Sequence, residues 1–478
     1  MLTLNDIRAE LPEPVLRPER QAWIDLYWRA WKLAVKNIRH GPAEVGFADA
    51  FLDAAFSENI FQWDTCFIVM FARYAWHVLP VHASLDNFYR KQDEDGWICR
   101  EYRGANGAAM FAKGSADAIN PPLFSWAEWA LYQLTGDRER LRRVWDALTR
   151  YDAWLRTHQR GPEGLYWSSQ LGCGMDNTPR FVARWVDFTA QQALNARCLA
   201  QIAEEIGQPS HIVEAYRREH EFLREQINRW MWDEEASVYW DLDGDLEPWP
   251  VLTIAPFWTL IADVVPPERA RRLVSHLRDP HRFWRPHPFP TLSADHPGYR
   301  ADGGYWTGAV WAPTNYAVIK GLTQAGFADL AYEATERHLD QMAAVFQETG
   351  TIWENYSAER PAPGQPAARD FVGWSGAGPI ALLIEEIIGV NADAARQHIR
   401  WRLLEDPPVG VRGLRLGDNV ISLVAEREEG GGIRATIEAE RPFQLEVLAG
   451  QTEFVEQVPA GRSTYLLTRL DRTDIRES

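Results

Sequence analysis

The sequence predicts an all-α (α/α)6 toroid followed by a small β-sandwich. Helical periodicity dominates residues 1–400, where about twelve helical segments are separated by breaks that contain Gly or Pro. No strand pattern alternates with these helices, which argues against a doubly wound α/β sheet. A solenoid would show a fixed repeat of about 34 or 40 residues, and none is found. An irregular helical bundle remains the alternative.

Each helical segment places apolar residues three or four positions apart, so that they share one face. Residues 17–38 show this spacing with Trp23, Tyr27 and Trp31. Pro80 ends the second segment and Gly136 the fourth, since Pro breaks a helix and Gly favours its C-terminal cap. The expected helices cover residues 17–38, 64–79, 82–92, 122–135, 139–159, 187–206, 210–231, 251–263, 267–277, 308–325, 328–348 and 375–388.

After residue 400 the apolar period changes from helical spacing to two. Between residues 433 and 440, apolar residues alternate with charged residues and Thr. Further strand-like runs cover residues 419–428, 442–450 and 463–470, with turns at 428–432 and 459–461. We therefore expect a catalytic toroid in residues 1–400 and a small accessory β-sandwich in residues 401–478.

Composition excludes several classes of protein. The 67 acidic and 50 basic residues give a net charge of −17, which argues against binding to nucleic acid or to an anionic membrane. No apolar run reaches the roughly 18 residues of a membrane span, and the N-terminus lacks a secretory signal pattern. The four cysteines form no CxxC pair, so we expect reduced thiols, a cytoplasmic protein, no metal site and no cofactor.

The 23 tryptophans suggest a sugar ligand, because an indole ring offers an apolar platform for the CH face of a sugar. Several loops combine Trp or Gly with single carboxylates at helix ends. In an (α/α)6 toroid, the loops at one end of the inner helices converge on one cleft. Two carboxylates facing each other there would suit glycoside hydrolysis, which needs an acid and a base. These loops are residues 61–67, 95–102, 120–126, 172–180, 303–316, 353–356 and 370–376.

Three carboxylates are candidates for this chemistry, and each has a structural alternative. Asp176 lies in the loop Gly-Met-Asp-Asn-Thr-Pro-Arg, where it could form an Asx-turn. Glu354 follows a Trp and could be a solvated loop carboxylate. Asp64 could cap a helix N-terminus.

Other candidate side chains are also open to two interpretations. Arg100 and Glu101 could bind substrate or form a surface ion pair of little energetic value. Trp306 and Trp311 could form a sugar platform or belong to the core.

Three motifs together resemble glycoside hydrolase family 63. They are Gly-Met-Asp-Asn-Thr-Pro-Arg (174–180), Tyr-Trp-Thr-Gly-Ala-Val-Trp (305–311) and Glu-Asn-Tyr (354–356). The similarity runs from about residue 60 to 390, and it is greatest to the bacterial glucosylglycerate and mannosylglycerate hydrolases of that family. Family 37 trehalases are more distant relatives. The resemblance implies an (α/α)6 barrel and an inverting, exo-acting α-glycosidase of small α-glucosides or α-mannosides.

The resemblance also implies roles for individual residues. Asp176 matches the general acid of the family and Glu354 its general base. Trp63 and Asp64 match a pair that holds hydroxyls of the terminal sugar, and Tyr305 with Trp306 matches a wall of that subsite. The expected substrate-binding residues are Trp63, Asp64, Arg100, Glu101, Asn120, Arg180, Tyr305, Trp306, Gly308, Trp311 and Trp374.

The chain departs from the family pattern at positions where the leaving group would be recognised. Thr307 and Ala309 stand where the family commonly has Arg and Pro, and Asn120 stands in place of Gln. Cys173 replaces Glu or Ser. A charged aglycone such as glycerate would need a cation near the cleft mouth, for which Arg103 and Arg180 are candidates.

Two other functions remain open at this point. A sugar epimerase or polysaccharide lyase on the same toroid would place His or Tyr at the centre of the cleft instead of two opposed carboxylates. A non-catalytic sugar-binding protein would keep the Trp platforms but would not need an acid with a raised pKa.

Overall fold

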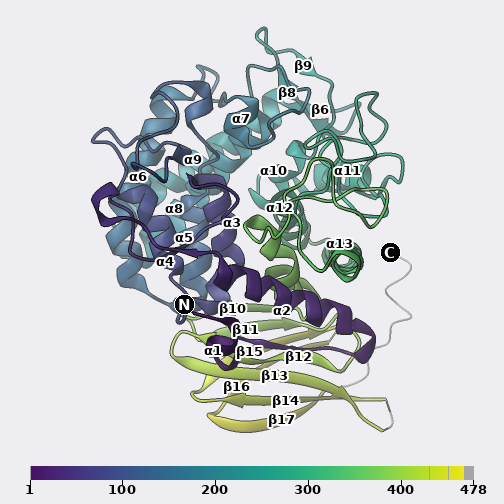
Figure 1. The fold of residues 1–478 in the computed structure, drawn as a ribbon. Helices are drawn as coiled ribbons and strands as arrows, with labels where there is room; N and C mark the ends of the chain where they lie inside the picture. Colours follow the sequence, from purple (N-terminus) through teal and green to yellow (C-terminus); the bar gives the residue numbers. More distant parts are fainter. Residues whose placement is uncertain (1, 430, 451, 468–478) are drawn as a thin grey trace.

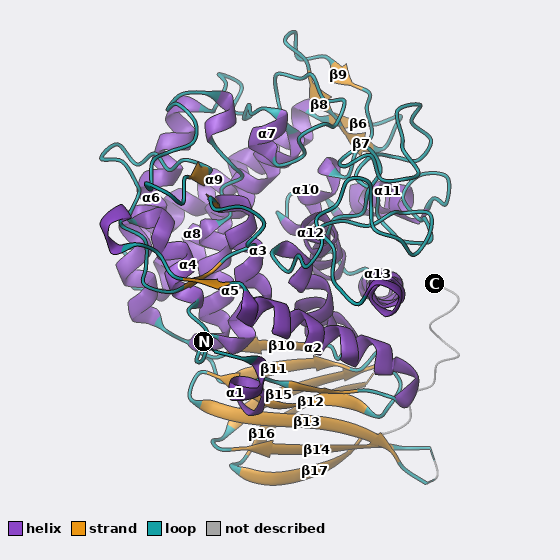
Figure 2. Ribbon diagram, viewed as in Figure 1, coloured by secondary structure: helices purple, strands orange, loops and turns teal. Residues whose placement is uncertain are grey.

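The computed structural model describes residues 2–429, 431–450 and 452–467. Helices occupy most of the chain up to residue 387, and two β-sheets follow at one end of the helical region (Figures 1 and 2). Among the described residues, no helix combines the length and apolar character that crossing a membrane requires.

Six helical segments form the inner layer of the helical region. Each packs against the next in chain order, and the last packs against the first, so the contacts close a cycle. Every residue of the first segment and of the last is buried. The six are α3 (Gln62–Ala72), α5 (Phe124–Thr135), α8 (Val186–Glu205), α10 (Trp258–Ile261), α12 (Ala312–Gln324) and η7 (Trp374–Ala377), which continues into the π-helix η8 (Gly378–Ile387).

Amphipathic helices alternate with the inner segments in sequence. The helix at residues 210–230, for example, buries only Val213, Leu223 and Ile227, as expected for a helix with one face in water. These helices are α2 (Gln21–Lys36), α4 (Val81–Tyr89), α6 (Arg138–His158), α9 (Ser210–Trp230), α11 (Pro267–Arg278) and α13 (Ala328–Thr349). Shorter helices are α1 (Leu4–Ile7), α7 (Gln170–Cys173), η1 (Arg8–Glu10), η2 (Pro18–Arg20), η3 (Ala43–Val45), η4 (Arg73–Ala75), η5 (Ala116–Ala118) and η6 (Ala255–Phe257).

The strands after residue 389, together with β1 (Glu13–Val15) from the N-terminal segment, form two sheets. The five-stranded sheet has the order β1-β12-β13-β14-β17, and the four-stranded sheet has the order β10-β11-β15-β16. The period-two pattern predicted β14, where Ile433, Ala435 and Ile437 are buried and Arg434 is exposed. The strands are β1 (Glu13–Val15), β10 (Val390–Asp393), β11 (His398–Arg402), β12 (Val409–Leu416), β13 (Asn419–Arg427), β14 (Ile433–Ala439), β15 (Phe443–Ala449), β16 (Thr452–Val458) and β17 (Gly461–Leu467).

The structure differs from the sequence prediction in several strands and in one helix. β10 and β11 begin before residue 401, and β1 comes from the N-terminal segment and pairs with β12. The predicted run 463–470 is a strand up to Leu467, and residues 468–470 lie outside the described part of the chain. The helix predicted at 251–263 is shorter, because it is divided between η6 and α10.

Short two-stranded ladders join loops within the helical region, and the sequence pattern did not predict them. Each strand has only two residues, too few to show an alternation of apolar and polar side chains. They are β2 (Ile38–Arg39) with β3 (Phe51–Leu52), β4 (Ile60–Phe61) with β5 (Glu101–Tyr102), β6 (Trp232–Asp233) with β7 (Val238–Tyr239), and β8 (Asp241–Leu242) with β9 (Pro248–Trp249).

A buried ion network connects three of the inner segments near their C-terminal ends. The Glu385 carboxylate of η8 accepts from Arg73 at 2.7 Å and lies 2.8 Å from the Lys320 ammonium of α12. Burial alone would raise the pKa of Glu385, but Lys320 and Arg73 lower that pKa to about 2. The network therefore holds the C-terminal ends of α3, α12 and η8 together.

Candidate active site

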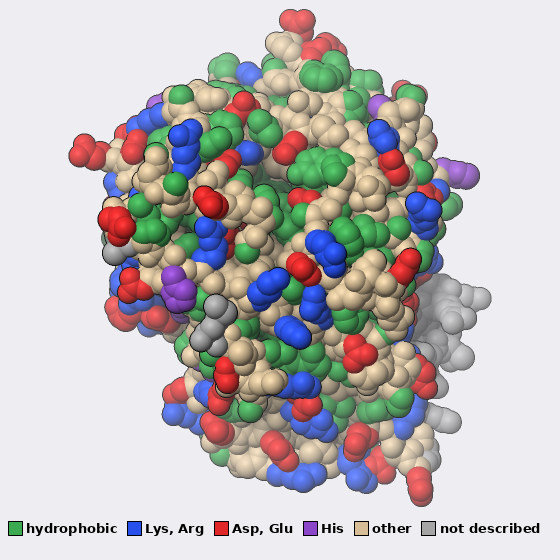
Figure 3. Space-filling model, in the orientation of Figure 1, with side chains coloured by type: hydrophobic (Ala, Val, Ile, Leu, Met, Phe, Trp, Pro, Cys, Tyr) green, Lys and Arg blue, Asp and Glu red, His purple; other side chains and the backbone are tan. Residues whose placement is uncertain are grey.

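The loops singled out in the sequence lead into the N-terminal ends of the inner helices. Asp64 lies in the first turn of α3, inside the helix rather than at its N-cap. Asp176 lies in the loop before α8, and Tyr305 lies in the loop before α12. The face of the helical region is hollowed near its centre (Figure 3). The fold therefore brings carboxylates that are distant in sequence to one end of the inner layer.

Electrostatic interactions show that these groups lie close together. The charge of Asp176 raises the pKa of Glu354, and the charge of Glu354 raises the pKa of Asp64, in each case in addition to the larger effect of burial. The pKa of Tyr305 is raised by burial and then by all three carboxylates, and Arg100 opposes these effects. Asp64, Arg100, Asp176, Tyr305 and Glu354 thus form one cluster, which we call the carboxylate cluster.

The loop that carries Asp176 passes against Trp63 at Gly174. Helix α7 ends at Gly174, whose φ of +84° favours glycine. A Cβ atom at Gly174 would lie 3.2 Å from the indole of Trp63, so the loop passes directly against that ring. The Asp176 side chain is half-buried, and burial raises its pKa although Arg100 lowers it.

Asn120 joins the two loops that carry Asp64 and Asp176. Its Oδ1 accepts from the backbone N–H of Trp63 at 3.4 Å, and its Nδ2 donates to the carbonyl of Gly172 at 3.3 Å. The residue is only 3% exposed. Both ends of the Asn120 amide are therefore bonded to backbone groups, so this side chain fixes the two segments to each other instead of reaching into open space.

Arg100 is a largely buried member of the cluster and not a surface residue. Its guanidinium donates to the carbonyl of Leu171, which belongs to α7, and stacks over Phe111 at 5.0 Å. Glu101 is 7% exposed and accepts from Asn59 at 2.6 Å, while its carboxylate lies 3.9 Å from Arg100. The Glu101 carboxylate therefore lies beside the Arg100 guanidinium and helps to hold it in place.

Glu354 is positioned through both its side chain and its backbone. Its Oε2 accepts from the backbone N–H of Ala368 at 2.9 Å, and its carbonyl accepts from the indole N–H of Trp374 at 3.0 Å. The side chain is 8% exposed. Burial raises the pKa of Glu354, and the Ala368 hydrogen bond acts in the opposite direction because it stabilises the carboxylate.

The aromatic loop before α12 supports one side of the cluster. Trp306 and Trp311 stack with ring centroids 3.8 Å apart, and both are almost fully buried. Tyr305 packs edge-on against Trp311 and is only half-buried, so it is the member that faces outward. At Gly308 a Cβ atom would lie 2.4 Å from the carbonyl of Arg300, which leaves no room for a side chain. The two indoles therefore belong to the core behind Tyr305.

Asn177 is a site residue that sequence reasoning missed. Its Oδ1 accepts from the backbone N–H of Trp306 at 2.8 Å, and its Nδ2 donates to the carbonyl of Gly304 at 2.9 Å. These bonds fix the loop of Asp176 to the loop of Tyr305. The motif that contains Asp176 includes Asn177, but nothing in its spacing shows which loop the amide would reach.

Arg180 requires a correction, because the structure does not place it as a substrate ligand. Its guanidinium makes two bonds of 2.7 and 2.8 Å to Asp187 and two of the same lengths to Asp241. It also stacks on Trp185 at 4.4 Å, and the residue is 1% exposed. We assign Arg180 to fixing the end of the Asp176 loop on α8 and β8. The partner Asp241 lies too far along the sequence for a local motif to reveal it.

Several buried polar atoms of the cluster have no hydrogen-bond partner among the described residues. They include the indole N–H of Trp63, Oδ1 of Asp64 and the Nε of Arg100. Buried polar atoms normally have partners, so these three are unsatisfied polar groups at or beside the cluster. In the same described ranges, no group of three or more His, Cys, Asp or Glu side chains could hold a metal ion.

A comparison with known families shows which family the chain belongs to. A family model described as the mannosylglycerate hydrolase MGH1-like glycoside hydrolase domain matches residues 57–375, which include every member of the cluster. The chain belongs to this family. This glycoside hydrolase therefore acts on a sugar substrate, and the predicted relationship to family 63 is confirmed.

Similar proteins can be aligned with much of the length of this glycoside hydrolase. A protein of Borreliella burgdorferi, described as uncharacterized, is 29% identical over 468 residues, which are 94% of this chain and 97% of the other. The Thermus thermophilus family 63 mannosylglycerate hydrolase in complex with glucose has a TM-score of 0.61 at 20% identity and covers 74% of this chain and 99% of its own. The neutral trehalase of Saccharomyces cerevisiae has a TM-score of 0.57 at 15% identity, covering 68% and 71%. The two solved structures show a shared fold.

We predict that Arg180→Lys lowers the free energy of unfolding by at least about 2 kcal/mol, because one ammonium group cannot replace four hydrogen bonds to two buried carboxylates. Urea unfolding measures this change. The matched control is Arg217→Lys, whose exposed pairs with Glu204 and Glu214 contribute little to stability. Equal losses in the two variants would contradict the structural role of Arg180.

Proposed function

We propose that the protein is an inverting exo-α-glycosidase, built on an (α/α)6 toroid, that hydrolyses a small α-glucoside or α-mannoside. Asp176 serves as the general acid and Glu354 as the general base. The observation that supports this best is that these two carboxyls, roughly 180 residues apart in sequence, interact within one half-buried to buried cluster. Glycoside hydrolysis needs such a pair, with one group protonated and the other ionised.

Asp176 protonates the leaving group in this mechanism. Its carboxyl proton passes to the glycosidic oxygen as the bond from that oxygen to the anomeric carbon breaks, and the aglycone leaves as an alcohol. Burial raises the pKa of Asp176, which favours the protonated form that the first step requires.

Glu354 activates the water. The Ala368 N–H stabilises Oε2 of the ionised carboxylate, and Oε1 accepts a proton from a water molecule that attacks the anomeric carbon from the opposite face. Inversion requires that the two carboxyl groups stand about 6.5–9.5 Å apart, so that this water fits between one of them and the sugar.

The rest of the cluster binds the terminal sugar. Oδ1 of Asp64 and the indole N–H of Trp63, which lack protein partners in the described ranges, hydrogen-bond to its hydroxyls. The half-buried ring of Tyr305 forms a wall beside the sugar. The Thermus relative was solved with glucose, which supports a hexose in this position.

A charged aglycone would meet a different set of cations from that expected from the sequence. Arg180 is enclosed by Asp187 and Asp241, so Arg103 remains of the two arginines considered from the sequence, and Arg100 lies three positions before it. Arg103 is exposed and donates to the sulfur of Met110 at 3.4 Å. We assign aglycone recognition to the loop that contains these residues.

The two β-sheets form an accessory domain in this proposal, which begins at Val390 and includes β1. All four cysteines are buried and unpaired, which suits a reducing compartment, and we propose a cytoplasmic location.

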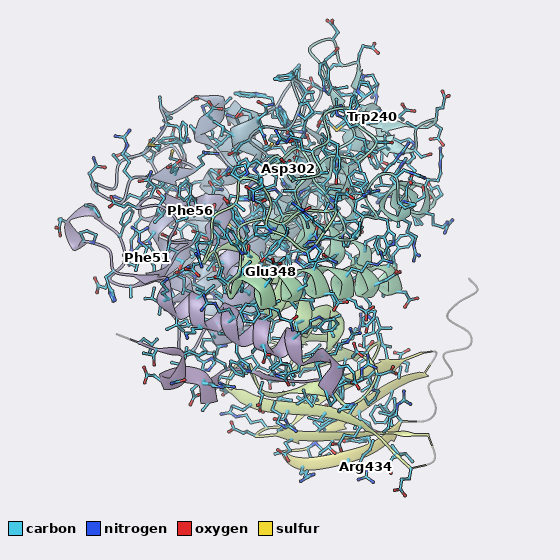
Figure 4. All side chains as sticks on the ribbon, turned by 45° about the vertical axis from the view of Figure 1, so that its right-hand side comes forward. Phe51, Phe56, Trp240, Asp302, Glu348 and Arg434 are labelled. Carbon is cyan, nitrogen blue, oxygen red and sulfur yellow. The ribbon has the colours of Figure 1, made fainter. Side chains whose placement is uncertain are left out.

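We predict that Asp176→Asn and Glu354→Gln each lower kcat at least about a hundredfold, because each removes a group that moves a proton in the transition state. Purified variants are assayed against a panel of α-glucosides and α-mannosides, with circular dichroism as the check of folding. Asp302→Asn is the control, since Asp302, which Figure 4 labels, lies near Tyr305 in sequence. Its carboxylate pairs with Arg300 and does not belong to the carboxylate cluster. Near-native turnover in either carboxylate variant would refute its role.

The pH dependence of kcat/KM gives a separate prediction for Arg100. Arg100 lowers the pKa of Asp176 and is not among the groups that shift the pKa of Glu354. In Arg100→Met the pKa of Asp176 rises, so the acid stays protonated to higher pH and the alkaline limb moves upward while the acid limb stays in place. Arg103→Met leaves both limbs unchanged. A downward shift of the alkaline limb in Arg100→Met would contradict the assignment of Asp176.

A further inference from the structure

A second cavity of about 440 Å³ lies at the opposite end of the inner helices from the carboxylate cluster. Asp64 is in the first turn of α3, whereas Arg73, on the wall of the cavity, follows its last residue. Nine residues of helix separate them by about 14 Å. The wall is formed by Arg73, Trp126, Trp129, Ala130, Gln133, Arg197, Cys198, Gln201, Ile261, Asp263, Tyr316, Lys320, Thr323, Gln324, Glu385 and Asn391.

A layer of aromatic rings separates the second cavity from the carboxylate cluster. Trp126 and Tyr316 line the cavity, and both pack edge-on against Phe67, at 5.9 and 6.5 Å between ring centroids. Trp258 contacts Trp126 at 6.2 Å on one side and Trp63 at 6.1 Å on the other. The second cavity is therefore a separate space.

The charged groups on its wall are paired with one another. Arg73 and Lys320 both contact the carboxylate of Glu385, and Lys320 also lies 2.7 Å from Glu386. Arg197 lies 3.7 Å from Asp263. Because each cation has a carboxylate partner, the cavity does not favour a ligand with a net charge of either sign.

Neutral hydrogen-bonding groups on the wall, in contrast, are available. The side-chain amides of Gln133, Gln201 and Asn391 and the indole N–H of Trp129 make no hydrogen bond within the described residues. The Nε of Arg73 is buried and also lacks a partner there. Amides can donate and accept at once, which matches neighbouring hydroxyls, and the Trp126 and Trp129 rings offer apolar surface to CH groups.

We propose that this cavity is a second binding site, for a neutral polyhydroxylated molecule of the size of a monosaccharide or disaccharide. Its volume falls within the range of small-molecule sites, about 300–1,000 Å³. The amides of Gln133, Gln201 and Asn391 bind hydroxyls, and Trp129 packs against the apolar face of the ligand. This site is independent of the catalytic assignment, because it shares no residue with the carboxylate cluster.

Calorimetric titration of the full chain with D-glucose and D-mannose tests the proposal. These monosaccharides undergo no hydrolysis, and each site contributes one binding event per chain. We expect two sites in the native protein for at least one of the two sugars. Trp129→Ala and Gln201→Leu weaken binding at the second site at least about tenfold and leave binding at the other site unchanged. The matched control is Gln208→Leu, which lies beyond the end of α8 and does not line the cavity.

Thermal unfolding and turnover of the α-glycoside panel show whether each variant is folded. If the catalytic proposal failed, turnover would be absent in the native protein, while sugar binding that depends on Trp129 and Gln201 would still support the second site. A single site insensitive to both variants would overturn the second site. Binding of inorganic phosphate, but of neither sugar, in a manner that depends on Arg197 would also overturn it.

Discussion

Like charges repel one another in a buried space, and the carboxylate cluster gathers three of them. The charge of Asp176 raises the pKa of Glu354, and the charge of Glu354 raises the pKa of Asp64, in addition to the effect of burial. The scaffold has to offset this repulsion. It does so with the closed cycle of inner helices and with hydrogen bonds that fix each loop to its neighbour. Asn120 and Asn177 connect the loop of Asp176 to its neighbours on either side, and Arg180 fixes its far end. Unfavourable electrostatics of this kind are typical of functional sites, where they shift the pKa values of the reacting groups.

Patterns of local origin could be predicted from the sequence, and contacts between distant residues could not. Helical spacing predicted α2, α6 and α9, since one face of each is apolar, and a period of two predicted β14. The π-helix η8 is buried on every side, so its sequence gives no periodicity that distinguishes it from an ordinary helix. β1 has three residues, too few for a pattern.

In the candidate site too, local motifs could be predicted from the sequence, and contacts between distant residues could not. The motifs around Asp176, Tyr305 and Glu354 predicted residues that the fold brings together. The partners that hold them could not be predicted, because Asp241 and Ala368 are not part of those motifs. Arg180 was expected to bind substrate for this reason: its sequence position beside the Asp176 loop does not show that two buried carboxylates already occupy its guanidinium.

The stereochemistry of the first-formed product tests the account most directly. An α-glycoside that is a substrate is incubated with the native enzyme in deuterated buffer, and the anomeric protons are followed by NMR from the first seconds. Attack by water held at Glu354 delivers the β-anomer first, and the α-anomer then grows only at the rate of mutarotation. Initial release of the α-anomer would mean that a covalent intermediate forms, and the roles given to Asp176 and Glu354 would be wrong.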